Sequence, residues 1–381
     1  MKGGVMLRRI EFRGVPYVDR EKEEKFLLHK LYNEEPTGLL FIYGPKSSGK
    51  TTFIEYIVEE KLKKEQRFYV NYVNFRRYAI VNYDSFLNIY FKPITEDTKG
   101  MLAKIKDTLK VVVSGLKGEV SIPEKGISYM VSFDLYKALQ EKNVDPFDLM
   151  YDVMERLREK GKIPVLIIDE VQELRDIYMN GEVRQRYLLT EFFKFLVGLT
   201  KETHLAHVII CTSSSIFIDE IYNHSNLAKT SEFYLFDHLN RETTRQWLLE
   251  EDFREKEVEL IWEYLGGCPF DLQRLLSSRR AYGEEFDLKE YLVGQAEEAR
   301  GKIKLFAIDE LDEEEDGKFT SILKEMVKKG YVENRKDKLF NRVVKKAVNR
   351  DILFLLAHKD KVVFNSQIMR KGAELYLKNS L

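Results

Sequence analysis

The eight-residue motif Gly44-Pro45-Lys46-Ser47-Ser48-Gly49-Lys50-Thr51 constrains this sequence more than any other feature. It fits the pattern G-x-x-x-x-G-K-[ST] of a loop that wraps around phosphate groups. Its glycines let the backbone curl so that successive N–H groups point inward, and the following helix adds the positive end of its dipole. Lys50 is expected to reach the β- and γ-phosphates of ATP or ADP, and the Thr51 hydroxyl to bind Mg²⁺. The motif therefore predicts nucleotide binding by these eight residues and by the next one, Thr52.

The residues on either side of the motif favour this interpretation over a chance match. The apolar run Leu39–Tyr43 precedes the motif and has the length of a buried strand. The apolar residues that follow it share one face of a helix: Phe53, Ile54, Ile57, Val58 and Leu62. A strand, a loop and a helix in this order are the context that a phosphate loop requires.

Short apolar runs alternate with longer helical patterns through the first two thirds of the chain, which predicts an α/β fold with a parallel sheet. The expected strands are Leu39–Tyr43, Phe68–Phe75, Val165–Ile168, Val208–Cys211 and Phe233–Phe236. Between the second and the third lies a long insertion at about 91–145. Within this insertion, the glycine-punctuated stretch Gly115–Gly126 is a candidate hairpin.

An acidic pair, Asp169-Glu170, directly follows the apolar strand Val165–Ile168. At the carboxyl end of a parallel strand beside the phosphate loop, Asp169 is expected to hold Mg²⁺ and Glu170 to orient and polarise the attacking water. The alternative is a strand that ends in a solvated acidic turn. The phosphate loop upstream favours the catalytic interpretation.

A second strand, Val208–Cys211, ends in the hydroxyl residues Thr212, Ser213 and Ser214. A hydroxyl at this position can contact the γ-phosphate or the attacking water. We therefore predict that Ser213 senses the nucleotide, with an ordinary Ser- and Thr-rich turn as the alternative.

From Asn240 onward the pattern becomes helical. We predict three domains, namely a nucleotide-binding domain at 1–239, a helical lid at 240–304 and a C-terminal domain at 305–381. The expected helices are Glu255–Leu265, Phe270–Leu276, Phe319–Lys329 and Phe340–Ala357, followed by extended pieces around Lys361–Phe364. The acidic run Asp309–Gly317 reads as a solvated linker or the end of a long helix.

The charge is unevenly distributed. The chain carries 62 Lys and Arg against 63 Asp and Glu, but residues 318–381 hold sixteen Lys and Arg against six Asp and Glu, a net charge of +10. This basic segment predicts contact with the phosphates of double-stranded DNA. The alternative is a helical module with solvated lysines that binds a protein partner.

Composition excludes several classes of protein. The longest apolar stretches, Leu39–Gly44 and Ile352–Ala357, have six residues each, whereas a membrane-spanning helix needs about 20. An apolar content of 44% excludes a wholly disordered chain. Only two cysteines, Cys211 and Cys268, are present, which is too few for a disulfide framework. We expect a cytoplasmic protein with no membrane span.

Taken together, the motifs resemble those of the archaeal P-loop ATPases, relatives of the AAA+ proteins that are often grouped with the signal-transducing STAND ATPases. The resemblance covers about residues 12–280. It rests on the phosphate loop, on Leu166-Ile167-Ile168-Asp169-Glu170, on Ser213-Ser214, on Gly267-Cys268-Pro269 and on Tyr17-Val18-Asp19-Arg20-Glu21-Lys22-Glu23.

This resemblance implies a three-layer α/β/α nucleotide domain with an AAA+-like parallel sheet, then a helical lid, then a winged-helix-like module. It implies roles for Lys50 in phosphate contact and catalysis, for Thr51 and Asp169 at Mg²⁺, for Glu170 in hydrolysis and for Ser213 as a sensor. It further implies that Val18, Asp19 and Arg20 lie on the adenine side and that Pro269 reports the nucleotide state to the lid.

The sequence departs from this family's pattern in one respect that bears on function. No arginine occurs between Arg186 and Arg241, so this segment supplies no arginine finger. Arg241 or Arg245 would have to act across an interface instead, and the oligomeric state stays open. We therefore predict a slow ATP-hydrolysing switch coupled to DNA or a protein. The alternatives are an ADP-retaining adaptor, a nucleic-acid motor and a P-loop kinase.

Overall fold

The central sheet of the computed structural model has five parallel strands in the order β4, β5, β8, β3, β9. The structure describes residues 9–96, 145–179, 186–223, 225–335 and 337–379. The strands are β3 (Leu39–Tyr43), β4 (Phe68–Asn74), β5 (Ile163–Asp169), β8 (His207–Thr212) and β9 (Ser231–Leu235). All five predicted strands are confirmed to within two residues at either end. The candidate hairpin Gly115–Gly126 lies outside the described residues.

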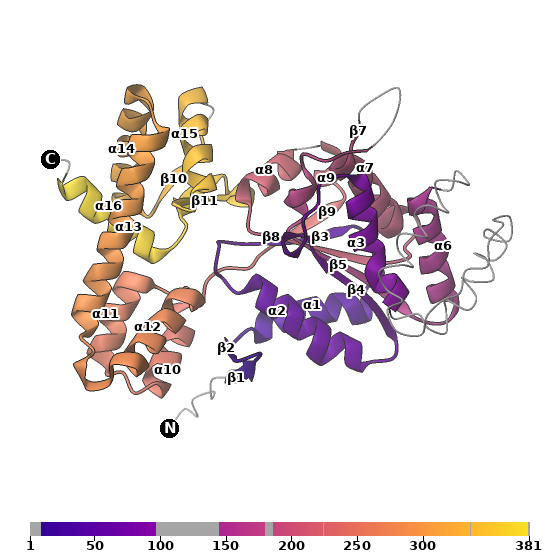
Figure 1. Ribbon diagram of the computed structural model, residues 1–381, viewed down its shortest axis with the longest axis horizontal. Helices are drawn as coiled ribbons and strands as arrows, with labels where there is room; N and C mark the ends of the chain where they lie inside the picture. Colours follow the sequence, from indigo (N-terminus) through magenta and orange to yellow (C-terminus); the bar gives the residue numbers. More distant parts are fainter. Residues whose placement is uncertain (1–8, 97–144, 180–185, 224, 336, 380–381) are drawn as a thin grey trace.

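Helices cover both faces of this sheet (Figure 1). One face carries α1 (Glu21–Asn33) and α2 (Lys50–Tyr56), which continues as a π-helical stretch (Ile57–Lys61) and a 3-10 turn (Leu62–Lys64). The other face carries α3 (Tyr83–Glu96), α6 (Pro146–Glu159), α7 (Leu188–Val197) and α8 (Ser215–Asn223). Because both faces are covered, central strands such as β3 are buried at every residue, which explains their continuous apolar runs. The predicted three-layer α/β/α fold is confirmed.

Shorter elements complete the nucleotide domain. The hairpin of β1 (Arg9–Phe12) and β2 (Val15–Val18) turns at Arg13-Gly14, where both residues have positive φ, 53° and 75°, as a tight two-residue hairpin turn requires. Other short elements are the 3-10 turns η3 (Phe75–Arg77) and η4 (Val171–Leu174), the antiparallel pair β6 (Tyr178–Met179) and β7 (Arg186–Tyr187), the π-helical stretch η5 (Gly198–Glu202) and helix α9 (Ser225–Ala228).

Four helices form the lid, and they lie to one side of the nucleotide domain (Figure 1). They are α10 (Arg241–Glu250), α11 (Glu255–Leu265), α12 (Pro269–Tyr282) and α13 (Leu288–Glu310). They pack around the fully buried Trp247. The predicted helix Glu255–Leu265 is confirmed at both ends, and the helix predicted at Phe270–Leu276 begins at Pro269, which fits because a proline at the first helical position gives up no hydrogen bond.

The C-terminal module consists of α14 (Glu313–Lys329), β10 (Tyr331–Glu333), α15 (Lys338–Asn349), β11 (Leu353–Leu356), β12 (Lys361–Phe364) and α16 (Gln367–Asn379). Its three strands form an antiparallel sheet in the order β10, β12, β11, and the module is winged-helix-like. The last helix, α16, returns to α13, where a Cβ on Gly372 would lie 2.7 Å from the backbone of Ala299. The glycine therefore allows the two helices to approach closely.

The predicted helix Phe340–Ala357 is wrong in its second half. The helix ends at Asn349, Asp351 adopts a left-handed backbone with φ of 57°, and the following residues form strand β11. A run of six apolar residues fits a buried strand as well as a buried helix, so periodicity alone did not separate the two.

Within the acidic run one helix ends and the next begins, with two residues between them. Helix α13 ends at Glu310, and α14 starts after Asp312, whose side chain and that of Glu315 form a capping box. Helix α13 therefore crosses the predicted boundary between 304 and 305, and the three-domain division stays a prediction. Within the described ranges, no helix combines the length and the apolar character that crossing a bilayer demands.

Candidate nucleotide-binding site

The phosphate loop connects the end of β3 to the start of α2, and its backbone shows why the glycines are needed. Gly49 has a φ of 91°, which a residue with a side chain rarely adopts. A Cβ on Gly44 would lie 2.0 Å from the carbonyl oxygen of Phe236, because the chain leaving β9 passes directly over the loop. Packing thus requires glycine at position 44, and the backbone conformation requires it at position 49.

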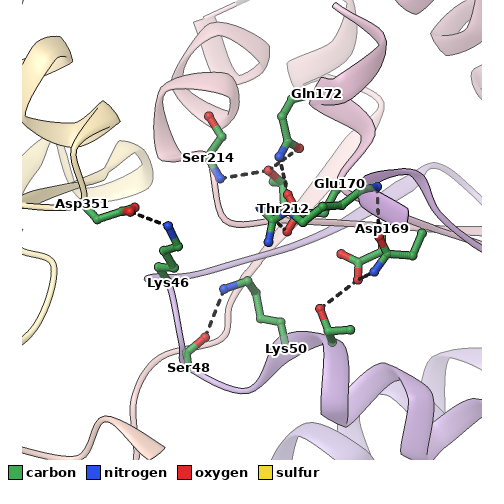
Figure 2. Close-up of polar contacts among 12 residues, drawn as sticks. Lys46, Ser48, Lys50, Asp169, Glu170, Gln172, Thr212, Ser214 and Asp351 are labelled. Atoms are coloured by element: carbon green, nitrogen blue, oxygen red, sulfur yellow. Dashed lines mark hydrogen bonds and ion pairs between the residues drawn. The ribbon is translucent and has the colours of Figure 1, made fainter. Parts of the chain in front are cut away.

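The ammonium group of Lys50 folds back into this loop. Its Nζ donates hydrogen bonds to the carbonyl oxygens of Gly44 and Pro45 at 2.9 and 2.8 Å. A third hydrogen bond goes to Oγ of Ser48 at 3.1 Å (Figure 2). Burial lowers the pKa of Lys50 to about 8, although the nearby carboxylates oppose this effect. The lysine is therefore a buried cation held by uncharged acceptors, and phosphate oxygens would be stronger acceptors in the same place.

Thr51 and Asp169 lie together at the predicted Mg²⁺ position. Oγ1 of Thr51 donates to Oδ2 of Asp169 at 2.9 Å, and Nδ2 of Asn74, at the end of β4, donates to the same oxygen at 3.0 Å. Burial, together with the charge of Glu170, raises the pKa of Asp169 to about 6. A hydroxyl and a carboxylate side by side are oxygen ligands of the kind that Mg²⁺ prefers, and the residues present fit this ion.

Glu170 begins the turn after β5 and is held on both carboxylate oxygens. Its backbone is left-handed (φ 60°), and its N–H donates to the carbonyl of Cys211 on β8 at 2.9 Å. Oε1 pairs with the guanidinium of Arg76 at 2.9 Å, and Oε2 accepts a hydrogen bond from Nε2 of Gln172. The side chain of Glu170 is only 4% exposed, whereas that of Arg76 is 55% exposed.

At the end of β8, the hydroxyl that joins this network is that of Thr212, one residue before the predicted sensor Ser213. Oγ1 of Thr212 donates to Oε1 of Gln172 at 2.9 Å and accepts from the N–H of Ser214 at 3.0 Å (Figure 2). The role of Ser213 stays a prediction.

The residues predicted on the adenine side lie between the lid and the phosphate loop. Val18 is buried in the lid cluster, and Asp19 accepts a hydrogen bond from the hydroxyl of Thr243 in α10. Arg20 is buried over the ring of Phe236, 4.2 Å from its centroid, and donates to the carbonyl oxygen of Ser48 at 2.7 Å. This segment therefore touches both the phosphate loop and the lid.

Pro269, the predicted lid reporter, starts α12 beside the phosphate loop. The preceding residue, Cys268, places its Sγ 3.9 Å from the carbonyl oxygen of Ser47. Arg241 and Arg245, the two candidates for an arginine finger across an interface, form ion pairs within their own chain. Arg241 pairs with Glu259, and Arg245 pairs with Glu255.

A contact that sequence reasoning missed joins the C-terminal module to the nucleotide site. Nζ of Lys46, in the phosphate loop, lies 2.6 Å from Oδ2 of Asp351 (Figure 2). The backbone N–H of Leu355 in β11 donates to the buried Oγ of Ser215 at 3.1 Å, and Phe354 stacks on Tyr43 with a centroid distance of 6.3 Å. The module thus packs on α8, the helix that follows the polar end of β8.

Sequence reasoning also missed Asn74, Arg76 and Gln172. Asn74 and Arg76 follow the apolar core of β4, and Gln172 follows the acidic pair by two residues. The available signal was that carboxyl ends of parallel strands share one edge of the sheet, so the polar residues after β4 belong with those after β5 and β8.

A parallel sheet with a phosphate loop after β3 and an Asp-Glu pair at the end of β5 defines an AAA+-like P-loop ATPase domain. A family model described as an ATPase domain predominantly from Archaea matches residues 17–275. The chain belongs to this archaeal ATPase family, and the predicted family is confirmed.

Two relatives from one archaeon agree with this assignment. An uncharacterized ATP-binding protein of Methanocaldococcus jannaschii is 34% identical over 279 residues, which cover 72% of this chain and 73% of that protein. A second one from this organism is 36% identical over 344 residues, 89% and 88% of the two chains. Among solved structures, the Aeropyrum pernix ORC2 protein in its ADPNP-ADP complexes matches with a TM-score of 0.43 at 12% identity, covering 99% of this chain and 97% of that one.

Proposed function

We propose that the protein binds and hydrolyses ATP slowly and acts as a switch that passes its nucleotide state to the C-terminal module. The observation that carries this proposal is the packing of the module against the site, where Asp351 contacts Lys46 in the phosphate loop and Leu355 contacts Ser215 at the start of α8. Because a nucleotide would bind against that loop, its arrival changes the surroundings of a residue that the module already contacts.

Each site residue has a part in this proposal. Lys50 exchanges its carbonyl and hydroxyl acceptors for phosphate oxygens, and Glu170 orients the attacking water. Thr51 and Asp169 hold Mg²⁺, which would supply positive charge to the β- and γ-phosphates. Ser213, as predicted, contacts the γ-phosphate side from the end of β8. The adenine lies against Val18, Asp19 and Arg20, and Pro269 follows the nucleotide state with the lid.

Phosphate release measured with the wild type and with Glu170→Gln tests the catalytic part. We expect slow turnover in the wild type and a loss of about 100-fold or more in the variant, because a general base contributes about 10²- to 10⁴-fold. ATP binding should persist. Full turnover in Glu170→Gln would refute the role of Glu170. Negligible release by the wild type, with ADP retained through purification, would identify an adaptor instead.

A distance measurement tests the switch itself. The native cysteines Cys211 and Cys268 are buried, so spin labels can be placed selectively at the exposed positions Lys22→Cys in α1 and Asn341→Cys in α15. In the Glu170→Gln background, ATP and ADP should give different distributions of the distance between the labels. Identical distributions with both nucleotides saturating would contradict the switch.

We propose duplex DNA as the partner of the module. Lys338, Arg342 and Lys345 recur at helical spacing on the exposed side of α15. Part of the basic charge is offset within the module, because Glu315 pairs with Arg342 at 2.6 Å and with Lys346 at 2.7 Å. We therefore expect only two or three phosphate contacts rather than the ten that net charge suggests.

The salt dependence of binding by the full chain checks this partner. Each phosphate contact contributes about −0.9 to the slope of log K against log salt, so the slope should be about −2 to −3. Lys338→Ala with Lys345→Ala should reduce its magnitude by about 2. The control pair Lys22→Ala with Lys25→Ala, on exposed α1 positions, should leave it unchanged. No binding to duplex even at low salt would favour a protein partner.

A further inference from the structure

We propose that Gln172 is a positioning residue that couples the Thr212 hydroxyl, at the end of β8, to Glu170, at the end of β5. The inference rests on the proposed function, since it matters only if Glu170 acts in hydrolysis. One amide group touches both partners. Its Nε2 donates to Oε2 of Glu170, and its Oε1 accepts from Oγ1 of Thr212 at 2.9 Å.

The chemistry of the partners fixes the orientation of this amide. A carboxylate oxygen accepts hydrogen bonds, so the nitrogen of the amide faces Oε2 of Glu170. The oxygen then faces the Thr212 hydroxyl, which donates. Thr212 also accepts a hydrogen bond from the N–H of Ser214 at 3.0 Å. Because an N–H cannot accept in return, the hydroxyl proton of Thr212 points to the amide oxygen of Gln172. A chain of three hydrogen bonds therefore runs from the start of α8 to Glu170.

The backbone brings the amide to this position. The left-handed conformation of Glu170 reverses the chain, and the 3-10 turn that starts at Val171 returns Gln172 toward the carboxylate. Glu170 and Thr212 are both buried, with Thr212 fully so. Gln172 itself is half-buried, but leaving a buried partner such as Thr212 unbonded is costly, which favours this arrangement.

The two oxygens of Glu170 are therefore held differently. Gln172 binds Oε2, whereas Oε1 pairs with Arg76, whose side chain is 55% exposed. A carboxylate anchored on one oxygen keeps its direction while the other is released to a water molecule. Without Gln172 the carboxylate would lose that direction, and a displacement of about 1 Å can cost about 10²-fold in rate.

The same chain links the site to the C-terminal module. Ser214 immediately precedes α8, whose first residue, Ser215, accepts the hydrogen bond from Leu355 in β11. A movement at the end of β8 that accompanies nucleotide binding would reach Gln172 in one direction and the module in the other. Gln172 thus sets the rate of hydrolysis according to the position of α8.

Steady-state hydrolysis by Gln172→Met, Thr212→Val and the double variant tests this inference. Methionine keeps the length of the side chain and valine the shape of threonine, and both remove the hydrogen bonds. We expect kcat to fall about 10- to 100-fold in each single variant, with KM within about threefold of the wild type. Because Gln172 and Thr212 act through the same chain of hydrogen bonds, kcat of the double variant should be no more than about threefold below that of the slower single variant. Independent effects would instead multiply.

Conservative and control variants keep the test decisive. Thr212→Ser, which retains the hydroxyl, should recover most of the rate. Gln172→Leu has no hydrogen-bonding group in its side chain, so it should be as slow as Gln172→Met, and it is the second variant if the methionine variant fails to fold. Gln246→Met removes a similar amide contact, with Glu242 in the lid, and should leave kcat unchanged.

The outcomes separate the two proposals. A wild type that releases no phosphate would overturn both the proposed function and this inference. A wild type that turns over, with Glu170→Gln inactive and Gln172→Met at the wild-type rate, would overturn the inference alone. Multiplicative losses in the double variant would also overturn it, because two unconnected residues would then be responsible.

Discussion

Replacing Ser215 with alanine should weaken the docking of the C-terminal module on α8 while every residue predicted to contact the nucleotide stays unchanged. The strand β11 lies at the edge of the sheet β10-β12-β11, so alternate N–H groups on its free side need other partners. The hydroxyl of Ser215 is one of these partners, since it accepts from the N–H of Leu355 at 3.1 Å, and Ser215 is fully buried.

The magnitude follows from the burial of this pair. Leaving a buried N–H without an acceptor costs about 1–3 kcal/mol. At 1.4 kcal/mol per tenfold, this corresponds to a shift of about 5- to 150-fold toward the undocked module. Hydrogen exchange of the Leu355 amide measures the shift directly, because this N–H becomes accessible when β11 leaves α8. We expect its exchange to accelerate by the same factor in Ser215→Ala.

Ser321→Ala is the matched control, because Ser321 is an exposed serine on α14. Hydrogen exchange of the Leu355 amide in Ser321→Ala should equal that in the wild type. Unchanged exchange at Leu355 in Ser215→Ala, in a protein with wild-type secondary structure, would refute the reasoning, since the hydroxyl would then not hold the strand.

Three further changes have definite expected outcomes. Gly44→Ala should abolish ADP binding measured by titration, because the new Cβ would meet the Phe236 carbonyl oxygen at 2.0 Å and force the loop out of shape. Nucleotide-free protein should lose stability through Asp169 as pH rises from about 4 to about 6, since the folded carboxyl, whose pKa is raised to about 6, binds more protons there than the unfolded one. Burial lowers the pKa of His207 to about 4, so this residue makes stability rise with pH over the same range. The thermal midpoint must therefore be compared between the wild type and Asp169→Asn. Trp247→Ala, in the lid core, should cost about 3–5 kcal/mol in denaturant unfolding, and a loss under 1 kcal/mol would contradict the burial argument.

The sequence allowed the sheet and the phosphate loop to be predicted because both depend on local patterns. Strands such as β3 are uniform apolar runs bounded by polar turns, and the loop needs glycines at fixed spacing. Asp169 was predictable for the same reason, since it directly follows such a run. Positions of this kind carry their explanation within a few neighbouring residues.

The remaining features depend on contacts between distant residues. Lys46 and Asp351 are separated by 305 positions, and nothing near either residue indicates the other. The interpretation of Phe340–Ala357 as one helix failed similarly, because the strand β11 is specified by its pairing with β12 and its packing on α8 rather than by its own periodicity. Gln172 is an ordinary polar residue until the ends of β5 and β8 are placed side by side.

In the proposed switch, two contacts connect the nucleotide site to the C-terminal module, and their energies decide which one dominates. The side chains of Lys46 and Asp351 are 54% and 41% exposed, and an ion pair of this kind contributes about 0–1 kcal/mol and weakens with salt. The Ser215–Leu355 hydrogen bond is buried, and breaking it costs about 1–3 kcal/mol. The route through the end of β8 and α8 therefore transmits more free energy than the ion pair, and the coupling of hydrolysis to the module should persist at high salt even where the ion pair contributes nothing.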